Sequence, residues 1–203
     1  MNLFIQMTIN SVFQICLFSL LPFLWWLITA RKKEGFLTWI GLKKGQNMWN
    51  HKMILWMLGT MFLFLFLSLF MFWSLKNVEM ATSVFAGKGP WAIPAILIYA
   101  VFNTALSEEI VFRGFLLKRV SEKFGFYKAN GFQSALFGLM HGVLFITTAG
   151  FLRTIWIVLF TGMIGWLMGF INEKIAKGSI LPSWCIHAGA NIFAGLCSAF
   201  LLF

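Results

Sequence analysis

The feature that most constrains this chain is a series of long apolar stretches separated by short clusters of lysine and arginine. A helix needs about 20 apolar residues to cross about 30 Å of hydrocarbon, and six stretches approach that length. The predicted spans cover residues 4–29, 53–75, 91–117, 129–149, 152–172 and 180–202. The sequence therefore predicts an all-α, polytopic membrane helix bundle with about six transmembrane helices, and residues 1–203 form a single integral membrane domain.

The composition excludes a soluble domain and argues against a nucleic-acid partner. Hydrophobic residues make up 60% of the chain and charged residues only 11%, whereas globular chains are roughly a quarter charged. The 16 Lys and Arg residues outnumber the 6 acidic ones, but they lie between apolar stretches, where such residues orient helices in a bilayer. The three cysteines have no CxxC spacing, so neither a disulfide framework nor a zinc knuckle is expected.

The basic clusters also predict an orientation. They concentrate in the loops near residues 31–52, 118–128 and 173–179, which should therefore be cytoplasmic, with both ends of the chain outside. Trp39 and Trp49 alternate with lysines in the first of these loops, a pattern that could form a short amphipathic segment on the lipid surface.

Polar side chains inside the predicted spans indicate where chemistry could take place, because ionisable groups in a membrane need a partner, a cavity or a function. They are Ser107, Glu108, Glu109 and Arg113 in the third span, His141 in the fourth, and His187 and Asn191 in the sixth. At a rise of 1.5 Å per residue, Glu108 and His187 lie about 15 Å, and His141 about 20 Å, from the predicted cytoplasmic end. They can therefore meet in one cavity facing the cytoplasm.

Helical geometry separates the roles of the two adjacent acids. Glu109 and Arg113 are four residues apart, in the order that favours an ion pair on one helix face. Glu108 is rotated by about 100° from Glu109, so it should point elsewhere and remain available for chemistry. His187 and Asn191 are also four apart and should share a face.

Glycines predict close packing in the fourth and fifth spans. Gly138 and Gly142 flank His141 and would let a neighbouring helix approach it. A second set, Gly162, Gly165 and Gly169, should form a packing face.

These residues fall into three motifs that resemble those of the CPBP family, the CAAX protease and bacteriocin-processing (ABI) intramembrane proteases. EExxxR runs from Glu108 to Arg113, FxxxH from Phe137 to His141, and HxxxN from His187 to Asn191. All three occur in order inside predicted spans, and residues 91–195 would form the catalytic core.

The resemblance implies an intramembrane endopeptidase in a bacterial plasma membrane, with its active site open to the cytoplasm. Glu108 and His141 would activate a water molecule, and His187 with Asn191 would stabilise the oxyanion, while Glu109 and Arg113 support the site. The substrate would be a membrane-associated peptide or protein, in CAAX-type processing or in bacteriocin self-immunity. The sequence specifies neither the natural substrate nor an oligomeric state.

A metal is the competing mechanism, because the family is often labelled metalloprotease. Glu108, His141 and His187 would supply the two histidines and one glutamate of some catalytic zinc sites. No HExxH helix is present, and the two acids are assigned to Arg113 and to the water molecule. No cofactor is therefore favoured, and a catalytic zinc ion is the alternative.

Two further classes of protein compete with an enzyme. A non-proteolytic scaffold or regulator on the same fold would not need the polar residues for catalysis. A transporter or proton pathway could also use intramembrane Glu and His, but the sequence shows no inverted repeat or paired broken helices of the transporter kind.

Overall fold

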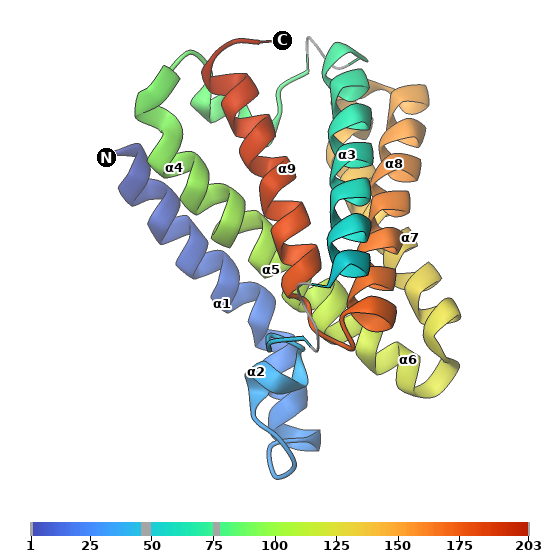
Figure 1. Ribbon diagram of the computed structural model, residues 1–203. Helices are drawn as coiled ribbons and strands as arrows, with labels where there is room; N and C mark the ends of the chain where they lie inside the picture. The colour runs from blue at the N-terminus through green and yellow to red at the C-terminus, as the bar shows by residue number, and fades with distance from the viewer. Residues whose placement is uncertain (1, 46–49, 75–77, 203) are drawn as a thin grey trace.

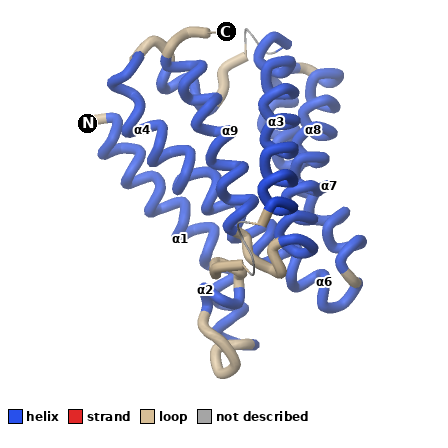
Figure 2. Tube along the Cα trace, in the orientation of Figure 1, coloured by secondary structure: helices blue, strands red, loops and turns tan. Residues whose placement is uncertain are grey.

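The computed structural model describes residues 2–45, 50–74 and 78–202, and these fold as helices joined by short loops (Figures 1 and 2). The long helices are α1 (Leu3–Thr29), α3 (His51–Ser74), α7 (Phe126–Ala149), α8 (Phe151–Phe170) and α9 (Leu181–Ala199). The third predicted span is a chain of shorter pieces: η2 (Gly89–Ala92), α4 (Ile93–Ile98), η3 (Tyr99–Leu106), α5 (Ser107–Glu109), η4 (Ile110–Leu117) and α6 (Lys118–Phe124). Three short segments complete the described part: α2 (Phe36–Trp39), η1 (Ala81–Phe85) and η5 (Ile171–Ile175).

Five helical stretches among the described residues are long and apolar enough to cross a membrane, in agreement with the first five predicted spans. They are Leu3–Thr29, His51–Met71, Gly89–Phe124, Phe126–Ala149 and Phe151–Ile175. The sixth predicted span folds as the 19-residue helix α9, which is not among the five. Its polar residues, including Ser183 and His187, lower its hydropathy, yet both are buried inside the bundle.

Helix α9 lies in the middle of the bundle, in contact with η3 on one side and with α3 on the other (Figure 1). Helix α1 packs against α4 and η3, and α7 packs against α8. This arrangement places the polar faces of α9, α5 and α7 toward one another.

The third span departs from a regular α-helix. Segments η3 and η4 are π-helical, on either side of the single α-turn α5 that carries Glu108 and Glu109. The hydroxyl groups of Thr104 and Ser107 donate to backbone carbonyls five residues earlier, Tyr99 at 3.3 Å and Phe102 at 3.1 Å. Such wide turns are rare and occur frequently at functional sites.

The predicted glycine packing joins α7 to α8. A Cβ atom on Gly138 would lie 2.4 Å from the Val158 carbonyl oxygen, and one on Gly142 would lie 2.4 Å from the Val158 side chain. The turn between the helices falls at Gly150, whose φ of 80° favours glycine. Glycines therefore let the two backbones touch, as the sequence predicts.

The prediction of a lipid-facing segment in the first loop is wrong for Trp39. Trp39 is only 3% exposed, its ring packs at a tilt against Phe115 with 6.0 Å between ring centroids, and the Arg119 guanidinium lies 4.1 Å from its ring centroid. Burial against the third span outweighs any contact with lipid. Trp49 lies outside the described residues.

Candidate active site

The predicted ion pair forms at the centre of the site. Arg113 Nη1 donates to Glu109 Oε1 at 2.9 Å, and both side chains are fully buried. The Arg113 guanidinium also lies 4.2 Å from the ring centroid of Phe137, a cation–π contact that compensates part of its lost hydration. The pair connects α5 and η4 and packs them against α7.

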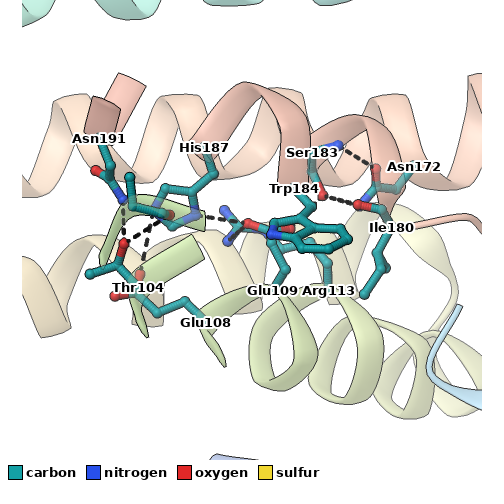
Figure 3. A network of polar contacts seen from close by, with 12 residues as sticks. Thr104, Glu108, Glu109, Arg113, Asn172, Ile180, Ser183, Trp184, His187 and Asn191 are labelled. Carbon is teal, nitrogen blue, oxygen red and sulfur yellow. Dashed lines mark hydrogen bonds and ion pairs between the residues drawn. The ribbon is translucent and has the colours of Figure 1, made fainter. Parts of the chain in front are cut away.

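His187 lies between the two glutamates (Figure 3). Its Nδ1 is 3.1 Å from Glu109 Oε1, and its Nε2 is 3.7 Å from Glu108 Oε2. The two acids therefore lie on opposite sides of the imidazole, Glu109 at Nδ1 and Glu108 at Nε2. Glu109 fixes the ring orientation, as carboxylates commonly do for functional histidines.

The two glutamates differ in how fully they are satisfied. Glu109 accepts hydrogen bonds from Arg113, His187 and the Ser183 hydroxyl. In contrast, Glu108 Oε2 is buried and has no hydrogen-bond partner, although its side chain is 14% exposed. A buried carboxylate oxygen without a donor is costly, so Glu108 is the acid with free capacity to hold a water molecule.

Ser183 and Asn172 belong to the site but are missing from the sequence prediction. Asn172 Nδ2 donates to Ser183 Oγ at 2.6 Å, and Ser183 N donates to Asn172 Oδ1 at 3.2 Å. Ser183 in turn donates to Glu109 (Figure 3). The available signal was the spacing of Ser183, which precedes His187 by four residues and so shares its helix face.

His141 lies beside this cluster and connects to it through Phe137. Its Nδ1 is 2.9 Å from the Phe137 carbonyl oxygen, which leaves Nε2 as the free ring nitrogen. The Phe137 ring lies 4.5 Å from the His141 ring and 5.9 Å from the His187 ring, between centroids.

Asn191 is held at the other end of the cluster. Its amide donates to Thr104 Oγ1 at 2.7 Å, and one further N–H of that amide stays available. His141, His187 and Asn191 line one pocket of about 190 Å³, whose other walls are mainly apolar. The structure therefore gathers the predicted residues from the third, fourth and sixth spans at one place.

The residues present do not fit a metal site in this arrangement. Over residues 2–45, 50–74 and 78–202, no group of three His, Cys, Asp or Glu side chains is placed to hold a metal ion. His187 turns Nδ1 to Glu109 and Nε2 to Glu108.

Comparison with known protein families identifies a match. The family model described as type II CAAX prenyl endopeptidase Rce1-like matches residues 90–193, a range that contains all three motifs. No curated protein and no solved structure matches the chain. The predicted resemblance to CAAX proteases is thus confirmed. With a matching family model over half of its length, the chain belongs to the type II CAAX prenyl endopeptidase Rce1-like family of intramembrane proteases.

Proposed function

We propose that this protein hydrolyses peptide bonds of membrane-associated polypeptides with a water molecule activated by Glu108 and His141. The observation that carries the proposal is the contrast between the two acids. Glu109 is saturated by three donors, whereas Glu108 keeps a buried oxygen without a hydrogen bond. A general base must reach the proton that it removes, either directly or through a water molecule.

The histidines have complementary roles in this mechanism. His141 uses Nδ1 on the Phe137 carbonyl, so its Nε2 can accept a hydrogen bond from the water and orient it, while Glu108 removes the proton and later delivers it to the leaving amine. His187 donates from Nδ1 to Glu109, and in its doubly protonated form it would also donate from Nε2, together with the remaining N–H of Asn191, to the developing oxyanion. Nε2 of His187 also faces Glu108 at 3.7 Å. The base and the oxyanion donor would therefore act on the same reacting group.

The substrate would be a membrane-associated peptide or protein, as in CAAX-type processing or bacteriocin self-immunity. The apolar pocket walls suit such a substrate, and the lysine-rich loops would place the ends near residues 31–52, 118–128 and 173–179 in the cytoplasm of a bacterial cell. The mechanism uses glutamate and water, without a step through a metal.

Glu108→Gln tests the proposal, because it preserves the side-chain volume and removes the base. We expect folded protein and a rate lower by about 100-fold or more, the scale of general-base catalysis. The assay is cleavage of a quenched fluorescent peptide in liposomes, with Glu122→Gln as the matched control, since Glu122 is 63% exposed and pairs only with Arg119 in the ion pairs of the described part.

The same variants separate the enzyme from a scaffold. If Glu108→Gln complements a deletion strain as well as the wild-type protein does, the physiological role does not depend on proteolysis. Equal cleavage rates for Glu108→Gln and wild-type protein would refute the mechanism itself.

A further inference from the structure

Two uncharged side chains next to the catalytic residues have no part in the proposed mechanism. Asn172 lies in η5 and Ser183 in the first turn of α9, and neither has any exposed surface. Asn172 is hydrogen-bonded to Ser183, and Ser183 is hydrogen-bonded to Glu109 (Figure 3). A buried chain of polar groups that ends on a carboxylate of the active site can control the orientation of that carboxylate.

The direction of the hydrogen bonds in this chain follows from one backbone group. A backbone N–H can only donate, so the amide oxygen of Asn172 must be the atom that lies 3.2 Å from Ser183 N. The amide nitrogen of Asn172 then lies 2.6 Å from Ser183 Oγ and donates to it. The Ser183 hydroxyl therefore accepts from Asn172 and keeps its own proton for a different acceptor.

The acceptor of this proton is Glu109. Two oxygen atoms lie within reach of the Ser183 hydroxyl, Glu109 Oε2 and the Ile180 carbonyl oxygen at 3.1 Å. The Ile180 carbonyl already accepts from Trp184 N at 3.0 Å, and the contact with Glu109 is the shorter of the two. A carboxylate is also the stronger acceptor, so the hydroxyl donates to Glu109.

Helix α9 thereby holds both oxygen atoms of the Glu109 carboxylate. Ser183 donates to Oε2, and His187, one turn later on the same helix face, has its Nδ1 3.1 Å from Oε1. A carboxylate that is held at one oxygen can still turn about its last single bond, whereas one that is held at both cannot. The direction in which His187 points Nε2 toward Glu108 therefore depends on the Ser183 hydroxyl.

We infer that Asn172 and Ser183 are positioning residues: Asn172 directs the Ser183 hydroxyl to Glu109, and the fixed carboxylate sets the angle at which His187 presents Nε2 to the reacting group. The inference rests on the proposed function, in which His187 donates to the developing oxyanion. A purely structural role, joining η5 to the first turn of α9, accounts for the bond from Ser183 N to Asn172. It does not require a hydroxyl directed at Glu109.

Ser183→Ala removes the hydroxyl and tests the inference. We expect kcat per folded protein to fall by about tenfold or more, because a displacement of about 1 Å can cost about 100-fold in rate. KM should not change, since the affected interaction is made in the transition state. Ser183→Thr keeps a hydroxyl and should recover most of the lost kcat. Ser11→Ala is the matched control, because Ser11 is also buried and its hydroxyl donates to the Met7 carbonyl within α1 at 2.7 Å.

Asn172→Ala shows whether the two residues act in series. Alone, it should lower kcat by a smaller factor than Ser183→Ala does, since the hydroxyl can still reach Glu109. Combined with Ser183→Ala, it should lower kcat by less than about twofold further, because substitutions that act through one shared contact are not additive. Full effects of both substitutions in the double variant would overturn the serial arrangement.

Nitrogen-15 NMR of protein labelled in the histidine rings gives a readout that does not depend on turnover. The chain has three histidines, and the signals of His187 are those that disappear in His187→Gln. We expect Ser183→Ala to shift or broaden the Nδ1 signal of His187, Ser183→Thr to restore it, and Ser11→Ala to leave it unchanged. The signals of His51, which is exposed at the start of α3, should be the same in all variants.

The two readouts separate this inference from the proposed function. A His187 signal that responds to Ser183→Ala, in a protein without any Glu108-dependent cleavage, would refute the proteolysis and leave the positioning intact. An unchanged His187 signal in Ser183→Ala would overturn the positioning, and so would a wild-type kcat in that variant.

Discussion

Glu109→Gln should act first on stability, and the structure sets the size of the effect. Glu109 is fully buried and accepts from Arg113 at 2.9 Å, from His187 at 3.1 Å and from Ser183. The substitution removes the charge that balances a guanidinium whose Nε and Nη2 have no other hydrogen-bond partner. Loss of one member of such a buried pair costs about 3–5 kcal/mol.

The assay is the free energy of unfolding in mixed micelles, measured alongside peptide cleavage. Glu122→Gln is the matched control, because the same change in an exposed pair is expected to cost about 0–1 kcal/mol. The double variant Glu109→Gln with Arg113→Met removes both charges and should recover part of the lost stability. If Glu109→Gln unfolds like the wild-type protein while cleavage disappears, the assignment of Glu109 as the supporting acid is refuted.

Three further outcomes are expected. Gly138→Ala should destabilise the protein by about 1–3 kcal/mol, because the added Cβ atom would lie 2.4 Å from the Val158 carbonyl oxygen. Gly131→Ala should not, because a Cβ atom there would meet nothing within 4 Å, and thermal unfolding compares the two variants. Thr104→Val frees the Asn191 amide, so kcat should fall, by less than the about 100–1,000-fold expected when an oxyanion donor is deleted; Asn191→Ala provides the comparison. Cleavage should survive exhaustive chelation, because the described residues form no three-ligand cluster; a loss of activity that zinc restores would contradict this prediction.

The sequence predicts the membrane bundle well, because the thickness of the hydrocarbon layer fixes the length of a spanning helix and clusters of Lys and Arg mark the loops between the helices. It also brings Glu108, His141 and His187 to a common depth by simple counting, since each lies on a helix of known rise. The pair of Glu109 with Arg113 follows from the same regularity, and the structure confirms it at 2.9 Å.

The rest of the site depends on features without a strong sequence signal. Ser183 and Asn172 are uncharged, and serines occur in membrane helices both as small packing residues and as hydrogen-bonding residues. The wide turns of η3 and η4 alter which residues share a helix face. A sequence pattern of 3.6 residues per turn does not predict such turns. The contact of His187 with both glutamates comes from the path of α9, which only the tertiary arrangement reveals.

The close contact between α7 and α8 at Gly138 and Gly162, here called the glycine seam, affects how these helices can move. Where the Gly138 and Gly162 backbones touch across the seam, there are no side chains between the helices to compress or rotate, so the hairpin is stiff and moves as a body. Helix α3, whose outer face is lined with exposed residues such as Leu58, Phe62 and Phe66, has no such seam in its described part, where a Cβ atom on Gly59 would meet nothing within 4 Å. Widening of the pocket during a catalytic cycle would therefore come from tilting of α3 against a fixed wall formed by α7 and α8.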